Sequence, residues 1–302
     1  MNFAGNAAAV VPVQISNHGL QTIKLNVAGI RISAYFETNT GPPLLLLHGN
    51  SSTKAVWLRQ FDLVRKMGRT ILAPDLPGHG ESGNSPTPAT TYSFPGYAAV
   101  ITALLDRLGL SSADVIGWSL GGHIGLQLLS TDKRVRSLLI AGTPPAPLCL
   151  KSLDSAFYSS EDMMLAGKEN FSAADAVAYG TAMMGGRESL PAALLRGVKR
   201  TDGNARRCMF ENALRGIGVD QRAVAESADR PLCIVHGECD PFVRLDYLRA
   251  VRYRRLWQNR IFVIAGAGHA PHWTHAAQFN GILSEFLGFV EYAGRGHPLL
   301  KP

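Results

Sequence analysis

The chain has 302 residues, of which 46% are hydrophobic and 18% are charged. This composition excludes an intrinsically disordered protein, and no stretch approaches the roughly 18 uninterrupted apolar residues of a membrane-spanning helix. A chain of this size buries roughly three-quarters of its extended surface, which is enough for one large core with an added lid.

The charge balance is basic, with 30 Lys and Arg residues against 23 Asp and Glu residues and a net charge of +7. A basic surface is typical of proteins that bind nucleic acid or anionic membranes, but also of an ordinary solvated face. Arginines cluster between Arg249 and Arg260, where Val251, Leu256 and Trp257 recur at helical spacing. We interpret this segment as one amphipathic helix with a basic outer side, so no nucleic-acid or membrane partner is predicted.

The cysteines and the N-terminal segment bear on the cellular compartment. The cysteines have no C-x-x-C spacing, and they are Cys149, Cys208, Cys233 and Cys239. A chain of this length needs no disulfide framework. The N-terminal segment lacks the basic region of a secretory signal. We therefore expect reduced thiols and a cytoplasmic location.

The first half of the chain alternates predicted strands and helices. Residues 21–36 are expected to form two strands around a turn at Ala28 and Gly29. The segments that follow are a strand at 44–47, a helix at 54–67, a strand at 70–76, a helix at 95–108, a strand at 113–118, a helix at 120–130 and a strand at 135–140. Such alternation predicts a parallel, doubly wound sheet.

The alternation stops at residue 142 and resumes at Pro231. Residues 148–228 are rich in Ala, Met, Leu and Arg, which predicts a helical insertion. After it we expect strands at 232–236 and 260–265, helices at 243–257 and 275–290, and a loose tail after residue 294. The prediction is an α/β core made of residues 1–142 and 230–302, with a helical cap at residues 143–229. A ligand is expected in the cleft between them.

A candidate nucleophile lies between a predicted strand and a predicted helix. Gly117, Ser119 and Gly121 fit the G-x-S-x-G motif of α/β-hydrolases, in which a sharp turn exposes the serine hydroxyl. The amide of Leu120 would point at developing negative charge from a helix N-terminus. The alternative is an ordinary serine in a glycine-rich turn. A serine here excludes dehalogenases and epoxide hydrolases of this fold, which have aspartate.

The expected base is one of nine histidines. His269 follows the last predicted strand on a glycine-rich loop, which suits the order Ser, acid, His of this fold. His123 lies on the same helix as Ser119, so we assign it to packing or internal hydrogen bonding. His269, His272 and His275 form H-x-x-H-x-x-H, and a metal site is the alternative, although no further acidic or Cys ligand is near. Packing roles are expected for the strand-end residues His48, His79 and His236, whereas the terminal His18 and His297 are uninformative.

The acid that orients the base is expected after the strand at 232–236. Asp240 lies in the loop above this strand and is favoured over Glu238, which is nearer the strand end, and over Asp246 on the following helix. A buried carboxylate would set the tautomer of His269. The second oxyanion donor is expected to be the backbone N–H of Asn50. The Asn50 side chain could contact the substrate, or serve only turn geometry.

Together these residues resemble the metal-independent α/β-hydrolase N-acyl-homoserine lactonases, which quench bacterial quorum signals. The matching stretches run from about residue 20 to 290 and include LLLHGNSS, ILAPDLPGHGES, GWSLGGHIG, AGTPP, DMMLAGKENFS, KRTDGNARRCMFE, DQRAVAE, VHGECDPFV and GAGHAPH. The core stretches are shared by many esterases, whereas those in the cap are specific. The resemblance implies an eight-stranded, mostly parallel sheet with an inserted helical cap.

The resemblance also implies roles for single residues. Ser119 is the nucleophile, His269 the base and Asp240 the acid, where the lactonase pattern has glutamate. The substrate-contacting tyrosine in the cap of the lactonases corresponds to Tyr179. Residues 180–184 depart from the lactonase pattern, so the resemblance leaves the acyl-chain preference open.

We therefore predict a serine hydrolase that opens the lactone ring of N-acyl-homoserine lactones through an acyl-enzyme. It is expected to need no cofactor or metal. The expected partner is a small acyl ester or lactone substrate, and the expected oligomeric state is a monomer or homodimer. One alternative is a carboxylesterase or thioesterase that acts on another small acyl substrate. A second is a protein of the same fold that binds a small ligand without catalysis.

We expect pocket walls at Trp118 and Trp273. Suitable flexible linings for an acyl channel are Met163, Met164, Met183, Met184 and Phe171, although for any single one of them packing between cap and core is the favoured alternative.

Overall fold

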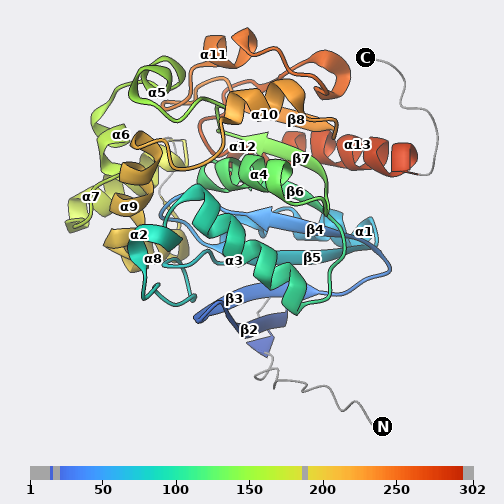
Figure 1. Ribbon diagram of the computed structural model, residues 1–302, viewed down its shortest axis with the longest axis horizontal. Coiled ribbons are helices and arrows are strands. Elements are labelled where there is room, and N and C mark those ends of the chain that lie inside the picture. Colours follow the sequence, from blue (N-terminus) through green and yellow to red (C-terminus); the bar gives the residue numbers. More distant parts are fainter. Residues whose placement is uncertain (1–13, 16–20, 186–189, 295–302) are drawn as a thin grey trace.

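The computed structural model describes residues 14–15, 21–185 and 190–294; His18, His297 and the tail after residue 294 lie outside them. The described strands form one sheet in the order β1-β2-β3-β5-β4-β6-β7-β8-β9 (Figure 1). They are β1 (Gln14–Ile15), β2 (Gln21–Val27), β3 (Ile30–Glu37), β4 (Gly41–Leu47), β5 (Arg69–Pro74), β6 (Ala113–Trp118), β7 (Val135–Ala141), β8 (Leu232–Gly237) and β9 (Phe262–Ile264). The predicted eight-stranded, mostly parallel sheet is confirmed, with the two-residue β1 added at its edge.

The sheet is antiparallel at one side and parallel in its centre. β2 and β3 pair antiparallel around Ala28 and Gly29, whose φ values of 50° and 79° suit a tight hairpin turn. From β5 through β4, β6, β7 and β8 to β9 every pair is parallel. β5, β6 and β8 are buried along their whole length, as expected for strands covered on both faces.

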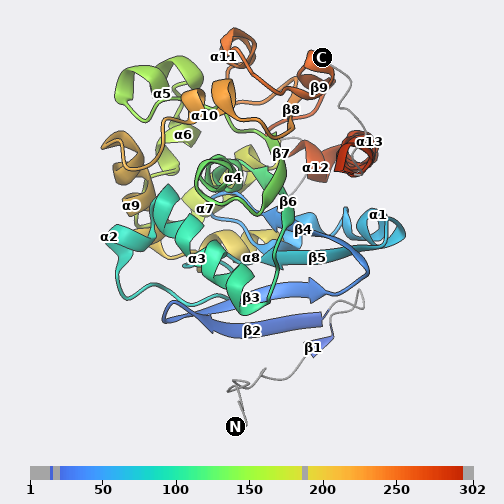
Figure 2. The same cartoon turned by 45° about the vertical axis from the view of Figure 1, so that its right-hand side comes forward.

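Helices cover both faces of the sheet. Figure 2 shows α3 and α4 on one face and α1 and α13 on the other. The helices outside the segment between β7 and β8 are η1 (Lys54–Trp57), α1 (Phe61–Lys66), α2 (Pro88–Thr91), α3 (Phe94–Arg107), α4 (Leu120–Thr131), α11 (Leu245–Ala250), η2 (Trp257–Asn259), α12 (Pro271–Thr274) and α13 (Ala276–Gly294). No helix in the described ranges combines the length and the apolarity needed to cross a membrane.

Two helices differ from their predictions. The expected helix at 54–67 is split into η1 and α1. The backbone N–H and the ammonium group of Lys54 both bond Asp75 and hold the first turn beside β5. The expected helix at 243–257 ends at Ala250.

The prediction of one amphipathic helix from Arg249 to Arg260 is therefore wrong. The chain after Ala250 runs beside β8, where the backbone N–H of Leu232 donates to Arg255 and Leu232 pairs with Leu256. Trp257 stacks on Phe262 at 4.9 Å. The apolar side chains are thus buried by an irregular segment and not by the inner face of a helix.

The segment between β7 and β8 is helical, as predicted. It contains α5 (Leu150–Ala156), α6 (Glu161–Leu165), α7 (Ala173–Met183), α8 (Ala192–Arg200), α9 (Gly203–Leu214) and α10 (Gln221–Ser227). Figure 1 shows α5 to α9 gathered at one end of the sheet. Hydrogen bonds join this segment to the rest, including those from Asn212 to the Tyr92 carbonyl and from the Tyr92 hydroxyl to Asp202.

Candidate active site

Ser119 lies at the sharp turn between β6 and α4 in a strained conformation. Its φ of 53° and ψ of −117° are rare for a residue with a side chain. A Cβ on Gly117 would lie 2.4 Å from the Gly121 carbonyl oxygen, and one on Gly121 would lie 2.1 Å from the Leu47 carbonyl oxygen. Since only glycine avoids both contacts, the two motif glycines permit the turn that exposes the Ser119 hydroxyl.

His269 and Asp240 form a buried pair. The Nδ1 atom of His269 lies 3.0 Å and 2.9 Å from the two carboxylate oxygens of Asp240. Asp240 also accepts hydrogen bonds from the backbone N–H groups of Phe242 and Val243, at 2.9 Å and 3.1 Å. Burial alone raises the pKa of Asp240, but His269 and these hydrogen bonds outweigh burial and hold the pKa below its ordinary value. The carboxylate is therefore ionised and keeps a proton on Nδ1 of His269.

The two other candidate acids lie elsewhere. Glu238 accepts a hydrogen bond from the backbone N–H of Gly266 at 2.9 Å. The Asp246 side chain is 99% exposed on α11, beside Arg249. Of the three acids that follow β8, Asp240 is the one that contacts His269.

The three histidines of the H-x-x-H-x-x-H pattern do not converge. His269 faces Asp240, and His275 bonds the Thr274 hydroxyl. The ring of His272 is fully buried between Trp57 and Trp118, and burial holds its pKa well below the ordinary value. Within the described ranges, no three His, Cys, Asp or Glu side chains are placed to hold a metal ion.

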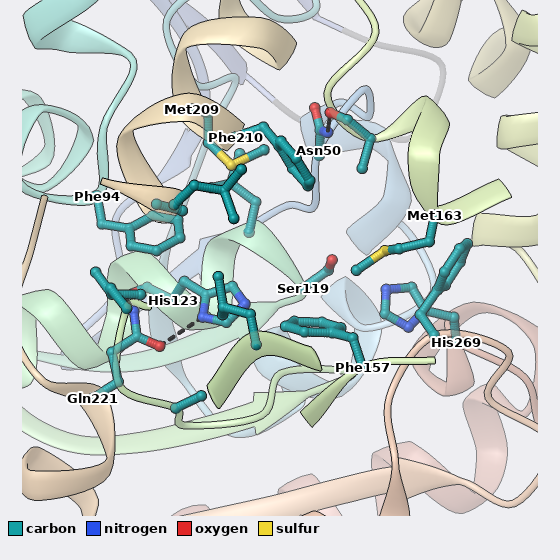
Figure 3. Close-up of a pocket in the computed structure, with 18 of the residues that line it drawn as sticks. Asn50, Phe94, Ser119, His123, Phe157, Met163, Met209, Phe210, Gln221 and His269 are labelled. Carbon is teal, nitrogen blue, oxygen red and sulfur yellow. Dashed lines mark hydrogen bonds between the residues drawn. The ribbon is translucent and has the colours of Figure 1, made fainter. Parts of the chain in front are cut away.

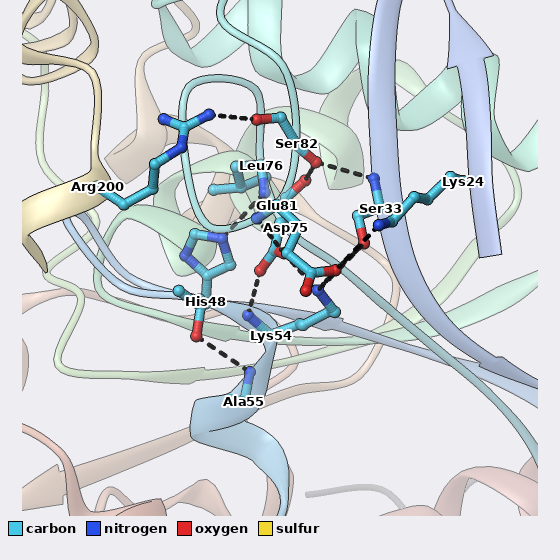
Figure 4. A network of polar contacts seen from close by, with 11 residues as sticks. Lys24, Ser33, His48, Lys54, Ala55, Asp75, Leu76, Glu81, Ser82 and Arg200 are labelled. Atoms are coloured by element: carbon cyan, nitrogen blue, oxygen red, sulfur yellow. Dashed lines mark hydrogen bonds and ion pairs between the residues drawn. The ribbon is translucent and has the colours of Figure 1, made fainter. Parts of the chain in front are cut away.

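The loop after β4 passes close to Ser119. A Cβ on Gly49 would lie 3.2 Å from the Cβ of Ser119. His48 holds this loop: its Nε2 accepts the backbone N–H of Leu76 at 2.9 Å (Figure 4). Its Nδ1 donates to the Gly49 carbonyl at 2.7 Å. Burial lowers the pKa of His48 to about 4, so the ring is neutral and makes both bonds.

Ion pairs hold the loop after β5, which contacts the loop after β4 through His48. The ammonium group of Lys54 lies 2.5 Å from the Asp75 carboxylate and 3.3 Å from that of Glu81 (Figure 4). Asp75 is fully buried, and its carbonyl accepts the Ser82 hydroxyl at 2.7 Å. This network fixes the loop after β5 that in turn holds His48.

Asn50 contacts the segment between β7 and β8. Its side-chain amide donates to the Ala166 carbonyl at 2.9 Å and to the Tyr179 hydroxyl at 3.3 Å. The sequence-predicted pair Asn50 and Tyr179 is thus brought together. Leu120 is the first residue of α4, so its N–H belongs to those that lack a partner inside the helix.

A pocket opens above Ser119 (Figure 3). Ser119, His269, Asn50, Leu120 and Tyr179 all line it. The rest of its wall is mostly apolar and is formed by Phe94, Ala146, Leu148, Leu153, Phe157, Met163, Ala166, Met183, Met209, Phe210, Ala213, Leu214 and Phe242, together with His123 and Gln221.

The two tryptophans predicted as pocket walls lie elsewhere. Trp118 is buried beneath the site and its Nε1 donates to the His269 carbonyl at 2.8 Å. Trp273 stacks against the guanidinium group of Arg59. Successive residues of a strand point to opposite faces of the sheet. Trp118, the last residue of β6, therefore turns away from the pocket that Ser119 lines.

The flexible linings are confirmed only in part. Met163 and Met183 line the pocket. Met164 is 68% exposed, and Phe171 packs under the guanidinium group of Arg206. Met184 lies at the end of α7 and is not among the described residues that line the pocket.

Sequence reasoning missed several wall residues. Those with no role predicted from the sequence are Phe94, Leu148, Phe157, Met209, Phe210, Gln221 and Phe242. The last four lie in stretches that match the lactonase pattern, but the match assigned no function to them. They come from α3, α9, α10 and the loops beside α5 and β8, so the folding of separate segments brings them together. Helical periodicity shows that such side chains are buried, but not against which partner.

The sheet topology, together with Ser119, Asp240 and His269 at the carboxyl ends of its strands, is typical of one family of proteins. A family model described as alpha/beta hydrolase fold matches residues 42–276. The chain belongs to the α/β-hydrolase fold family.

Curated relatives span most of the chain. A putative non-heme chloroperoxidase of Synechocystis sp. is 26% identical, over 85% of this chain and 95% of the relative. A pimeloyl-(acyl-carrier protein) methyl ester esterase of Aeromonas hydrophila is 29% identical, over 82% of this chain and 96% of the relative.

Solved structures are more similar. A mutant of the N-acyl homoserine lactonase AidH, complexed with N-hexanoyl homoserine lactone, is 39% identical with a TM-score of 0.85, covering 89% of this chain and 98% of that chain. A complex of AidH with N-butanoyl homoserine has a TM-score of 0.84. An aryl esterase from Burkholderia cenocepacia, described as putative, is 18% identical with a TM-score of 0.75 and shares the fold alone.

Proposed function

We propose that the protein is a serine hydrolase in which Ser119, His269 and Asp240 form the catalytic triad. The observation that carries this proposal is the strained Ser119 turn in the same pocket as His269, whose Nδ1 is held by a buried carboxylate. With Nδ1 protonated, Nε2 of His269 is free to accept the Ser119 proton. The amide groups of Asn50 and Leu120 would hold the oxyanion.

The chemical steps follow from these roles. Ser119 Oγ attacks the carbonyl carbon and its proton passes to Nε2 of His269. The imidazolium, stabilised by Asp240, then protonates the leaving alkoxide as the acyl–oxygen bond breaks. Water attacks the acyl-enzyme, and the same histidine takes its proton and returns one to Ser119.

The substrate we propose is an N-acyl homoserine lactone, whose opening would silence a quorum signal. The 39% identity to AidH over nearly the whole of that chain supports this choice. The polar contact of Asn50 with Tyr179 at one end of the pocket suits the lactone and its amide, and the apolar wall suits an acyl chain. No metal is required by this mechanism, and we place the reaction in the cytoplasm.

Residues 143–229 would act as the cap that selects the acyl chain. Pocket residues such as Met163, Met183, Met209 and Phe210 come from α6, α7 and α9 of this segment. Residues 1–142 and 230–302 would form the core that carries the triad.

Hydrolysis of another small ester is the second candidate. Its support is the esterase from Aeromonas hydrophila, 29% identical over 82% of this chain. A non-catalytic binding protein would have no need of the strained turn at Ser119, which costs folding energy.

The test is hydrolysis of N-acyl homoserine lactones beside p-nitrophenyl esters of matched chain length, with Ser119→Ala as control. We expect lactone opening that Ser119→Ala abolishes and a chelator leaves unchanged. Activity that survives in Ser119→Ala refutes the mechanism. Ester cleavage without lactone opening refutes the lactonase function alone.

A further inference from the structure

One polar pair interrupts the apolar wall of the pocket. His123 lies on α4, one turn after Ser119, and Gln221 is the first residue of α10. Both side chains are buried and line the pocket, and His123 stacks on Phe94 with ring centroids 5.0 Å apart (Figure 3). The proposed triad chemistry uses neither residue. A buried polar pair costs folding free energy unless its donors and acceptors find partners.

The contacts of Gln221 determine where the proton of His123 sits. Nδ1 of His123 lies 2.7 Å from Oε1 of Gln221, and Nε2 of Gln221 donates to the His123 carbonyl at 3.4 Å. With the amide reversed, two acceptor oxygens would face one another. The amide oxygen therefore faces Nδ1, which must carry the proton, and Nε2 of the His123 ring is left as an acceptor.

The free nitrogen faces the interior of the pocket. Figure 3 shows it on the side of the His123 ring that is turned toward Ser119. It forms no hydrogen bond with any residue that the structure describes. Burial lowers the pKa of His123 to about 4, so the ring is neutral at neutral pH. Besides His269, the pocket thus presents an unpaired hydrogen-bond acceptor at Nε2 of His123, on the side that faces the nucleophile.

The position of His123 indicates which part of a substrate it meets. The leaving oxygen must lie beside His269, so the acyl half extends along the opposite side, where His123 lies. Four residues along α4 separate Ser119 from His123, a rise of about 6 Å. An extended chain covers about 6 Å in five bonds. In an N-acyl homoserine lactone, the atom five bonds from the attacked ring carbonyl is the third carbon of the acyl chain.

We propose that His123, oriented by Gln221, accepts a hydrogen bond from a hydroxyl group on the third carbon of the acyl chain. This inference rests on the proposed lactonase function. A 3-oxo group has only acceptors to offer Nε2, and an unsubstituted chain leaves it unpaired. We expect kcat/KM to be about three- to tenfold higher for 3-hydroxyacyl chains than for unsubstituted ones, and lowest for 3-oxo chains.

The test compares N-hexanoyl, N-(3-hydroxyhexanoyl) and N-(3-oxohexanoyl) homoserine lactones in three proteins. These are the unchanged protein, His123→Phe, which keeps the ring on Phe94 but removes the acceptor, and the control Met164→Leu, whose side chain is exposed and does not line the pocket. We expect the 3-hydroxy preference to fall to about one in His123→Phe and to persist in Met164→Leu. A preference absent from the unchanged protein, or surviving in His123→Phe, overturns the proposal. If His123→Phe lowers kcat/KM equally for all three lactones, the proposal is also overturned. In that case His123 contacts the amide N–H that all three substrates share.

Failure of the lactonase function is distinguished by a second substrate pair. If esters are cleaved and lactones are not, p-nitrophenyl 6-hydroxyhexanoate replaces the hydroxylated lactone, because its hydroxyl-bearing carbon is also five bonds from the attacked carbonyl. The same three- to tenfold preference over p-nitrophenyl hexanoate is expected. Equal rates for the two esters overturn the assignment of His123.

A measurement without turnover tests the positioning role of Gln221. In protein labelled with ¹⁵N-histidine, NMR should show the His123 proton on Nδ1 and an unprotonated Nε2. Gln221→Met removes the oxygen that holds this proton and should shift the tautomer toward Nε2–H, lowering the 3-hydroxy preference. A proton on Nε2 in the unchanged protein overturns the proposal.

Discussion

Replacing Asp240 with asparagine isolates the contribution of one proton position to catalysis. The Oδ1 atom of Asp240 accepts the backbone N–H groups of Phe242 and Val243, so the asparagine oxygen must stay there. Its NH₂ group then takes the position of Oδ2, which lies 2.9 Å from Nδ1 of His269. Nδ1–H of His269 would then meet this donor and, 3.0 Å away, an oxygen that already accepts two backbone N–H groups, so the tautomer with the proton on Nε2 is favoured. That nitrogen then has no lone pair for the Ser119 proton.

The size of the loss follows from this tautomer. Trapping the histidine of a catalytic triad in the wrong tautomer lowers kcat by about 10⁴ in serine proteases. This corresponds to about 5 kcal/mol of lost transition-state stabilisation. We expect Asp240→Asn to lose about 10³- to 10⁴-fold in kcat while it keeps its fold, because the backbone hydrogen bonds to Oδ1 are preserved.

The assay is kcat for lactone or p-nitrophenyl ester hydrolysis, with the thermal midpoint as a check of folding. Glu238→Gln is the matched control, since this side chain lies two residues away and bonds only the Gly266 amide among the described residues. It should keep kcat within about twofold. If folded Asp240→Asn keeps more than a tenth of the activity, the tautomer argument is wrong.

Three further predictions concern the fold and its pH dependence. Gly121→Ala should fail to fold or lose nearly all activity, because its Cβ would lie 2.1 Å from the Leu47 carbonyl oxygen; normal expression and kcat would contradict this. Arg69→Met should lower the free energy of unfolding in urea by up to about 3–5 kcal/mol, because fully buried Asp114 loses its nearer ion-pair partner and keeps Arg136 at 3.7 Å; a change under 1 kcal/mol would refute it. His48 has a pKa of about 4 when folded and about 6.5 when unfolded, so its stabilisation is complete above pH 6.5 and is lost toward pH 4, by about 3 kcal/mol. His48→Gln should flatten that part of the stability profile, and an unchanged slope between pH 6.5 and 4 would count against the burial argument.

Local patterns predicted the parts of the site that lie on one segment. The strand, turn and helix around Ser119 were predicted within a residue or two, because the motif glycines and the apolar run before them are local signals. Asp240 and His269 were predicted from their positions after strands, since the carboxyl ends of parallel strands meet at one edge of a sheet. Their contact follows from topology, which the alternation of elements already implied.

The segment after Ala250 shows the limit of such reasoning. Helical spacing of Val251, Leu256 and Trp257 predicted one helix, yet the helix ends at Ala250 and the irregular segment that follows pairs with β8 at Leu256. Periodicity records which side chains are buried, and here burial is achieved by a neighbour distant in sequence. The prediction that Trp118 forms a pocket wall was wrong because proximity to Ser119 in the sequence does not show on which side of the site a side chain lies.

The amino-acid sequence by itself determined the fold, the turn at Ser119 and the order of the three proposed catalytic residues, because each depends on short-range geometry or on strand order. Only the tertiary structure decided which walls enclose the pocket. Packing of α10 against α4 places Gln221 beside His123, and α9 brings Met209 and Phe210 to the wall of the same pocket, although roughly 85 to 100 residues separate them from His123. Long-range packing has no local signature, so the features that would select a substrate emerge only after the chain has folded.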